Sequence, residues 1–392
     1  MRTLFFGTPA FGHVVPELPL ARALREQGHV VAFATAASMA GLVGSEGFEL
    51  LQAGPEIPET IAEVERSAGV NLLKDGVTVE TEAEFFAGAR VDLGYEQCLA
   101  AALDWKPDLI VAEALDYVAP MVGAELGVPV ATLAFGPAIP PENVEAAQAR
   151  VKARHQRFGL DVPPSQWYLD TCPPSLQVDG WQAPDTRMAL RPEAYTGGGA
   201  PTSVSGPDAA ADSCDPDAGR ARPRVLVSFG TMFVIPEIIT PIARELLKQD
   251  THVLITLGPN RTSEEFDLHS ERVEFVEFTP LDRLLGDVDV VVTVGGAGTV
   301  LGALAHGVPL VMTPLGADQP LHAGRAQAAG AGIAFPLGEC EPQRVAEAVS
   351  LVLRTPDYRQ AARRVAAEIS GMPSPAEVAA KLAAELGACL DR

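Results

Sequence analysis

One long stretch without charge limits what this chain can fold into. Residues 290–317 contain no Asp, Glu, Lys or Arg, a run long enough to suggest a membrane-spanning helix. Gly295, Gly296, Gly307 and Pro309 interrupt the run, however, and β-branched residues are concentrated towards its two ends. A buried strand, a helix and a second buried strand explain the run better than a membrane span does. We therefore expect a cytoplasmic protein.

Short apolar runs alternate with helical segments along both halves of the chain. The first half contains RTLFFGT, HVVAFAT, PDLIVAE and PVATLAF, and the second contains PRVLVSFGT, HVLITLG, VEFVEF, VDVVVTV and VPLVMTP. Runs that are apolar on both faces and alternate with helices are typical of parallel sheets covered on both sides. The sequence therefore predicts an α/β fold with two Rossmann-like, doubly wound parallel-sheet domains, and a ligand at the carboxyl ends of the strands.

A change in composition divides the chain. Residues 191–222 are dominated by Gly, Pro, Ala, Ser and Asp and contain few large apolar residues, as linkers do. They separate a predicted N-terminal domain, residues 1–190, from a predicted second domain, residues 223–375. A further amphipathic helix is predicted over residues 376–392.

The charge and the cysteines exclude several classes of protein. The formal net charge of −22 argues against nucleic-acid binding, which needs Lys and Arg to replace phosphate counterions. The N-terminal MRTLFFGTPAFG has only a short apolar run and does not resemble a signal peptide. Neither a disulfide framework nor a zinc site is expected, because the cysteines are scattered and form no CxxC: Cys98, Cys172, Cys214, Cys340 and Cys389.

A glycine-rich turn after a predicted strand is a candidate phosphate site. The turn follows Val294 and consists of Gly295, Gly296, Ala297, Gly298 and Thr299. A strand that ends in Gly-Gly and leads into a helix presents backbone N–H groups at the positive end of the helix dipole, where a diphosphate can bind. The alternative is that the glycines only allow close packing. The spacing differs from GxGxxG, and no P-loop motif occurs in the chain.

Polar and aromatic residues follow other strands of the second domain. Ser228 and Thr231 come at the end of its first strand, and Phe278 and Thr279 follow a later one. Asp318 and Gln319 follow VPLVMTP and offer a carboxylate and an amide for sugar hydroxyls, although this pair is also common as a helix cap. The strand-end positions favour a donor site built from these residues.

The first domain contains a candidate base. His13 lies between the first strand and the first helix, and Glu113 ends another strand of the same sheet. An imidazole at that edge can act as a general base, and a carboxylate can orient it and stabilise its protonated form. Asp116 competes with Glu113 for this role.

These segments together resemble a known family. The resemblance is carried, in order, by GHVVPELPLARALREQGH, PDLIVAE, SFGT and VGGAGTVLGALAHGVPLVMTPLGADQP, and it covers nearly the whole chain. They resemble the antibiotic-modifying glycosyltransferases of actinomycetes, which are GT-B enzymes of glycosyltransferase family 1. The resemblance implies inverting, metal-independent transfer from a nucleotide-activated sugar to a hydroxyl or aromatic carbon of a hydrophobic natural product such as a polyketide. It favours a TDP-deoxysugar over a UDP-sugar as donor and implies no further cofactor.

The resemblance also assigns roles to residues. It implies that His13 deprotonates the acceptor, that Glu113 orients the imidazole, and that the last helix crosses back onto the first domain. It assigns the diphosphate to residues 296–299, the base to Phe278 and Thr279, and the sugar to Asp318 and Gln319. The acceptor pocket is expected to involve residues 56–98 and 135–182. A homodimer and an auxiliary protein both stay open.

Two positions depart from the resemblance. Relatives usually carry histidine where this chain has Val294, and aspartate where it has Glu113. Without that imidazole the site lacks a charge-assisted hydrogen bond worth about 1.5–3 kcal/mol, so Val294→His is expected to strengthen nucleotide-sugar binding. A degenerate relative that binds without turnover is therefore an alternative. A nicotinamide oxidoreductase is a third reading, suggested by Asp318 about 20 residues after Gly298, but the glycine spacing disfavours it.

Overall fold

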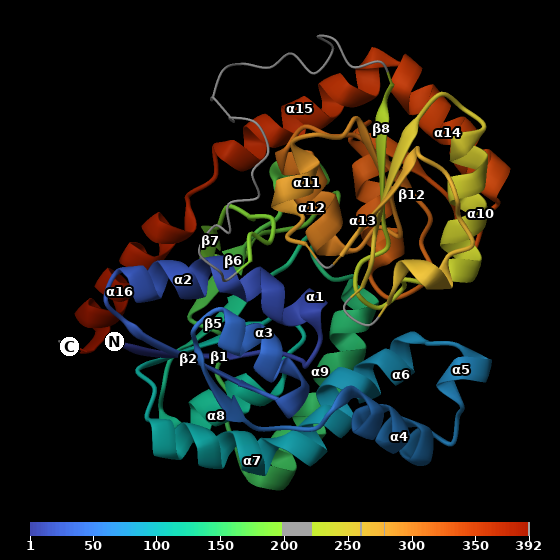
Figure 1. The fold of residues 1–392 in the computed structure, drawn as a ribbon. Helices are drawn as coiled ribbons and strands as arrows, with labels where there is room; N and C mark the ends of the chain where they lie inside the picture. The colour runs from blue at the N-terminus through green and yellow to red at the C-terminus, as the bar shows by residue number, and fades with distance from the viewer. Residues whose placement is uncertain (198–221, 259–260, 278, 391–392) are drawn as a thin grey trace. The chain divides into compact units, whose positions relative to one another are not determined.

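The computed structural model describes residues 1–197, 222–258, 261–277 and 279–390, without the side chains of residues 73, 389 and 390. Of the predicted linker, residues 198–221 lie outside the described residues, as does Phe278. The chain forms two compact units (Figure 1). Unit 1 comprises Met1–Cys172, Gln177–Pro192 and Met372–Arg392, and unit 2 comprises Pro173–Leu176 and Glu193–Gly371.

Unit 1 is built on a seven-stranded sheet in which all neighbouring strands are parallel. The strand order is β3-β2-β1-β4-β5-β6-β7. The central strands are buried on both faces, which explains why their sequences are continuously apolar. The strands are β1 Arg2–Phe6, β2 Val30–Thr35, β3 Glu49–Gln52, β4 Leu109–Glu113, β5 Val130–Leu133, β6 Trp167–Asp170 and β7 Arg187–Ala189.

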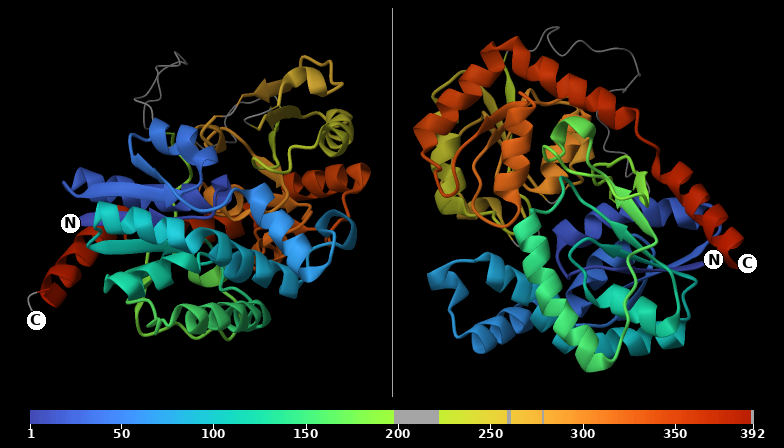
Figure 2. Two further views of the ribbon diagram at one scale, coloured as in Figure 1. Left: turned by 90° about the horizontal axis from the view of Figure 1, so that it is seen from below. Right: turned by 180° about the vertical axis from the view of Figure 1, so that it is seen from behind.

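Helices surround this sheet, and α9 runs along α6 and the π-helical segment that follows it (Figure 2, green). The α-helices of unit 1 are α1 Phe11–Val14, α2 Leu18–Glu26, α3 Ala40–Ser45, α4 Ile57–Ala68, α5 Leu72–Asp75, α6 Val79–Ala83, α7 Arg90–Trp105, α8 Val118–Leu126, α9 Pro141–Phe158 and α16 Pro375–Leu390. Short 3-10 turns occur at Val15–Glu17 and Ala37–Met39, and the π-helical segment is Glu84–Ala89.

Unit 2 repeats the architecture with six parallel strands in the order β10-β9-β8-β11-β12-β13. The strands are β8 Arg224–Ser228, β9 His252–Thr256, β10 Val273–Val276, β11 Val290–Thr293, β12 Leu310–Met312 and β13 Gly332–Ala334. The α-helices are α10 Pro236–Leu247, α11 Asp282–Leu285, α12 Ala297–Ala305, α13 Gln319–Ala328, α14 Pro342–Arg354 and α15 Pro356–Ser370, and 3-10 turns occur at Pro174–Leu176 and Ser263–Glu265. The predicted α/β fold with two doubly wound parallel sheets is confirmed.

The charge-free run forms the centre of unit 2. It folds as β11, α12 and β12, and both strands are fully buried. Because both strands and most of α12 are buried, the run needs no charged face. Over the residues that the structure describes, no helix is both long and apolar enough to cross a membrane.

The last helix, α16, packs against α2 within unit 1 (Figure 1). Val378, Ala379 and Leu382 are buried in this contact region, and Glu385 accepts a 2.5 Å hydrogen bond from Nε1 of Trp167. Apolar residues at helical spacing therefore attach this helix to unit 1.

Candidate active site

Each sheet has one point at which the strand order reverses. It lies between β1 and β4 in unit 1 and between β8 and β11 in unit 2. In doubly wound sheets, ligands bind outside the carboxyl ends of the strands at this point. The predicted base residues lie at the first reversal point, and the predicted phosphate turn lies at the second.

His13 and Glu113 come together at the carboxyl edge of unit 1. His13 lies on α1, just after β1, and Glu113 is the last residue of β4. Nδ1 of His13 is 3.0 Å from Oε1 of Glu113. The carboxylate is fully buried, whereas the imidazole is 19% exposed and so remains accessible. The two elements therefore build the dyad expected from the sequence.

Hydrogen bonds fix the carboxylate of Glu113. Oγ1 of Thr8 donates to Oε1 at 2.9 Å, and the backbone N–H of Leu115 donates to Oε2 at 2.6 Å. Burial raises the pKa of Glu113, but His13, the Leu115 N–H and Arg90 together lower it by more, so the pKa lies below its ordinary value. An ionised carboxylate only accepts hydrogen bonds, so the shared proton belongs to Nδ1 and Nε2 carries the lone pair of a base.

Asp116, the alternative partner for His13, has other roles. Its Oδ2 accepts a 2.5 Å hydrogen bond from buried Arg90, and its Oδ1 accepts the first N–H groups of α8 at 3.0 and 2.8 Å. Asp116 therefore anchors α8 and Arg90, and Glu113 is the acid hydrogen-bonded to His13.

A third carboxyl group lies behind the dyad. Glu17 ends the turn Val15–Glu17 and is fully buried, and neither of its side-chain oxygens has a hydrogen-bond partner among the described residues. Burial and then the charges of Glu113 and Asp116 raise its pKa well above the ordinary value, against a smaller lowering by Arg90 and the Glu113 backbone. A carboxyl group in these surroundings keeps its proton to a higher pH than an exposed carboxyl group does.

Two phenylalanine rings lie next to the imidazole of His13. The ring centroid of Phe86 is 5.6 Å from that of His13 at an interplanar angle of 40°, and that of Phe135 is 5.4 Å away at 69°. Phe86 belongs to the π-helical segment and Phe135 follows β5, and both rings are half-buried. The base therefore lies in aromatic surroundings.

The predicted phosphate turn joins β11 to α12 in unit 2. The side chain of Val294 is buried in the hydrophobic core of this unit. Gly295 has φ 93°, and a Cβ at this position would lie 3.1 Å from the backbone oxygen of Gln319. Both observations require glycine at 295, and they bring the start of α13 next to the turn.

The helix that follows the turn can bind an anion through its backbone. Gly296 is the N-cap of α12 and has an extended conformation. In the first turn, Ala297 is buried, Gly298 is exposed and Thr299 is half-buried. The N–H of Thr299 donates to the carbonyl of Gly296 at 3.1 Å. The first N–H groups of a helix generally have no partners within the helix, and small residues let an anion approach them.

The first strand of unit 2 ends beside this turn. Ser228 pairs in register with Thr293, the last residue of β11, and its hydroxyl accepts a 3.1 Å hydrogen bond from Thr256. Thr231 is half-buried just beyond Ser228. Thr279 is half-buried shortly before α11.

Asp318 and Gln319 begin α13, and both side chains already have partners. Gln319 is buried, and its Oε1 accepts the N–H groups of Leu315 and Gly316 at 2.8 and 3.1 Å. Oδ2 of Asp318 lies 3.0 Å from Nε2 of His322. The amide of Gln319 thus shapes the loop, whereas the side chain of Asp318 is 39% exposed and is the more accessible of the two.

Sequence reasoning singled out the dyad but missed the residues around it: Thr8, Glu17, Phe86, Arg90 and Phe135. Thr8 and Glu17 lie close to His13 in the chain, so their proximity could have identified them. Phe86 and Phe135 fall within the two segments expected to shape the acceptor pocket, but no pattern there marks single residues.

Two further features bear on the kind of site. Among the described residues, no three His, Cys, Asp or Glu side chains gather as ligands for a metal ion. An open cavity of 530 Å³ on unit 1 is lined by residues of α4 and α7 and the loop Gly54–Pro55, and none of its lining residues is a candidate site residue.

Comparison with known proteins decides the family. Residues 22–200 match the N-terminal domain, and residues 242–385 the C-terminal domain, of the family described as erythromycin biosynthesis protein CIII-like. These matches cover more than half of the chain. The chain belongs to this family.

Relatives of this CIII-like chain include named glycosyltransferases. The elloramycin glycosyltransferase ElmGT of Streptomyces olivaceus is 30% identical, and the match covers 99% of this chain and 98% of that protein. The solved structure of the glycosyltransferase SnogD from Streptomyces nogalater is 30% identical with a TM-score of 0.72, covering 98% and 99% of the two chains. That of SsfS6 from Streptomyces sp. SF2575, in complex with thymidine diphosphate, is 26% identical with a TM-score of 0.78, covering 97% and 99%.

These comparisons confirm the resemblance found in the sequence. The CIII-like chain is a glycosyltransferase with the GT-B fold.

Proposed function

We propose that this chain is an inverting glycosyltransferase that moves a deoxysugar from a TDP-sugar to a hydroxyl group of a polyketide aglycone. The observation that carries the proposal is the His13–Glu113 pair at the strand-order reversal of unit 1. The thymidine diphosphate bound to SsfS6 and the natural product named for ElmGT support the donor and acceptor classes.

The chemistry follows from the protonation of the dyad. Glu113 keeps the proton on Nδ1, so Nε2 of His13 takes the proton of the acceptor hydroxyl while the acceptor oxygen attacks C1 of the sugar. The bond between C1 and the diphosphate oxygen breaks, and TDP leaves with the electron pair. Attack from the side opposite the leaving group inverts the configuration at C1, and protonated His13 then returns its proton to solvent.

The donor is assigned to unit 2. Backbone N–H groups of residues 296–299, at the positive end of α12, bind the diphosphate and stabilise the charge that develops as it leaves. Ser228 and Thr231 border the same edge of the sheet, Thr279 borders the base, and Val294 and Gly295 contribute backbone groups only. Asp318 binds the sugar, and Gln319 supports it by holding the preceding loop.

A second candidate function is a binding protein without turnover. Val294 favours it, because a buried valine cannot donate a hydrogen bond to the diphosphate.

One experiment separates the two functions. The full chain is incubated with TDP-rhamnose, a TDP-activated 6-deoxysugar, and a panel of polyketide aglycones, and the release of TDP and the mass of the glycosylated product are measured. Formation of a glycosylated product by the wild type, and its loss in His13→Ala, would support the glycosyltransferase function. Binding of TDP without TDP release with any aglycone would favour the binding protein and contradict the proposal.

A further inference from the structure

A π-helical segment carries two phenylalanines next to the candidate base. Residues Glu84–Ala89 lie between α6 and α7, in a form that is rare in proteins and is often found at functional sites. The rings of Phe85 and Phe86 are 4.8 Å apart at an angle of 76°, and Phe86 is in turn 5.6 Å from His13. The geometry of this segment therefore decides what lies against the imidazole.

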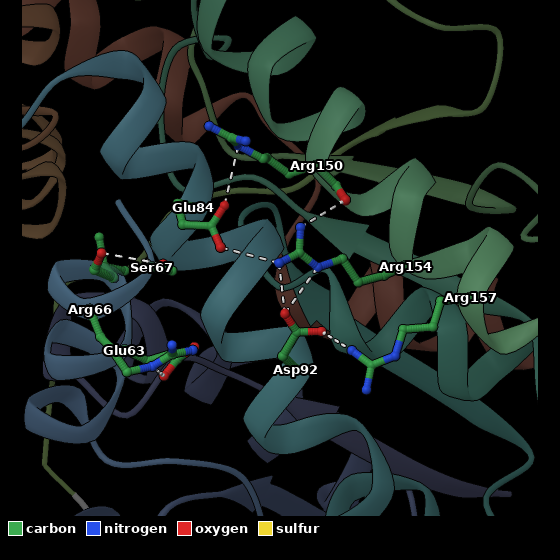
Figure 3. A network of polar contacts seen from close by, with 9 residues as sticks. Glu63, Arg66, Ser67, Glu84, Asp92, Arg150, Arg154 and Arg157 are labelled. Atoms are coloured by element: carbon green, nitrogen blue, oxygen red, sulfur yellow. Dashed lines mark hydrogen bonds and ion pairs between the residues drawn. The ribbon is translucent and has the colours of Figure 1, made fainter. Parts of the chain in front are cut away.

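Charged side chains tie the segment to α9 (Figure 3). The two carboxylate oxygens of Glu84 lie 3.1 Å from Arg154 and 3.2 Å from Arg150, both on α9. Arg154 also lies 2.6 Å from Asp92 of α7, which is 3.0 Å from Arg157. Glu84 and Arg154 are mostly buried, so their interaction is sensitive to geometry and favours one arrangement of the segment on α9.

Gly88 provides the space that this network needs. A Cβ at position 88 would lie 2.3 Å from Oε1 of Glu84, because the carboxylate folds back over the glycine. Any side chain at 88 would force this carboxylate, which is paired with Arg150 and Arg154, to shift. The glycine and the ion pairs thus act together to set the position of Phe85 and Phe86.

A third ring completes the aromatic surroundings of His13. Phe135, from the loop after β5, meets the imidazole edge-on at 5.4 Å. All three phenylalanines are half-buried, so each keeps part of its surface accessible. Phenyl rings stack on or meet the edges of other aromatic rings with a gain beyond that of apolar burial. Saturated rings lack the conjugated face on which this gain depends.

We propose that Phe85, Phe86 and Phe135 bind a planar, fused aromatic acceptor, and that Glu84 and Arg154 position the π-helical segment for it. The inference rests on the proposed function, because it names the class of molecule whose hydroxyl His13 deprotonates. The three phenylalanines contact the acceptor. Glu84 and Arg154 act only through the segment, so they are positioning residues.

The test measures acceptor binding to the full chain with two probes. Alizarin is a planar dihydroxyanthraquinone, and erythronolide B is a saturated macrolactone. We expect tighter binding of alizarin, and an increase of about two- to tenfold in its Kd in Phe86→Ala and Phe135→Ala. Phe158→Ala is the matched control, since Phe158 is a half-buried phenylalanine of unit 1 that packs on Tyr95 at 4.5 Å, and it should leave both Kd values unchanged.

Positioning is tested by variants that leave the three rings in place. Glu84→Gln removes the charge, and Gly88→Ala displaces the carboxylate while keeping every charge. Both variants should lower the ratio of the Kd for erythronolide B to the Kd for alizarin. A general loss of stability does not change this ratio. A lowered melting temperature with an unchanged ratio would overturn the positioning role.

The outcomes separate this inference from the proposed function. Equal affinity for the two probes, no binding of alizarin, or an effect of Phe86→Ala no larger than that of Phe158→Ala would overturn the aromatic acceptor site. Calorimetry with TDP on the same samples reports on the donor site. Absence of TDP binding would contradict the proposed function and leave the comparison of the two acceptor probes intact.

Discussion

Nδ1 of His13 lies 3.0 Å from Oε1 of Glu113, a residue one hundred positions further along the chain. The parallel sheet brings them together, because β1 and β4 are neighbours and both point to the same edge. The pair therefore depends on the topology of the fold, and its charge state depends on the buried groups around it.

Replacing Glu113 by glutamine removes the negative charge of this side chain while keeping its size and shape. The amide oxygen can still accept the hydrogen bond of Nδ1, but it no longer stabilises the imidazolium that forms when His13 takes a proton. We expect turnover with a TDP-sugar to fall by about 10²-fold or more, while the affinity for TDP stays unchanged. Glu113→Asp, which keeps the charge, should retain more activity. Wild-type turnover in the glutamine variant would contradict the assigned role.

Glu17 should make the stability of the protein depend on pH. Its pKa in the folded state lies well above the ordinary value, so the folded protein keeps this proton at pH values where the unfolded chain has released it. Glu17 should therefore lower the free energy of unfolding as pH rises above about 4.5, which is near its pKa in the unfolded chain. This loss of stability should stop growing once the carboxyl group of Glu17 also ionises in the folded protein. Glu17→Gln removes this loss.

The check is urea denaturation of both proteins between pH 5 and 8. The variant should be more stable than the wild type, and the difference should increase with pH. A difference of constant size across this range would show that Glu17 is ionised in the folded protein or that the variant acts through packing alone.

Val294→His should have two opposite effects. The side chain at 294 lies in the hydrophobic core of unit 2, so an imidazole there should lower the melting temperature of the protein without ligand. A donor at the start of the phosphate turn should also raise the affinity for TDP, by the roughly 10- to 100-fold that corresponds to about 1.5–3 kcal/mol. Thermal unfolding without ligand and calorimetry with TDP measure the two effects separately. Calorimetry that shows no gain would contradict either the placement of the diphosphate at this turn or the expectation that an imidazole at this buried position reaches it.

Gly295→Ala should damage the same turn. The backbone φ of 93° and the close oxygen of Gln319 leave no room for a methyl group, so we expect the free energy of unfolding to fall by about 1–3 kcal/mol. The affinity for TDP should fall as well. Gly324→Ala in α13 is a suitable control, because nothing lies within 4 Å of its Cβ position. Equal stability of the two variants would argue against the strained turn.

The sequence predicts the fold well where burial is complete. Runs such as RTLFFGT and VDVVVTV are apolar on both faces because β1 and β11 lie in the middle of covered sheets. The sequence analysis does not predict β3, β6, β7 and β13, because each has only three or four residues and β3, β7 and β13 are also partly exposed, so they leave little periodic signal. Strand-end positions also indicated His13 and Glu113, because the topology places the carboxyl ends of parallel strands together.

The surroundings of the dyad could not be read in the same way. Glu17 lies close to His13 in the sequence, but it looks like an ordinary first-turn acidic residue, and only the structure shows that its carboxyl group is buried. Phe86 lies in the π-helical segment, and Arg90 follows it as the first residue of α7. The π-helical winding shifts the helical period, so the sequence pattern assigns no inward face there. Their positions follow from tertiary contacts.

The most direct test of the central claim compares wild type and His13→Ala in one assay. The rate of TDP release from a TDP-sugar is measured with an aglycone that the wild type glycosylates, and the affinity of both proteins for TDP is measured by calorimetry. If His13 is the general base, turnover falls by about 10²–10⁴-fold while the affinity for TDP stays within about twofold of the wild-type value. Full transfer to an oxygen acceptor by the alanine variant would contradict the account.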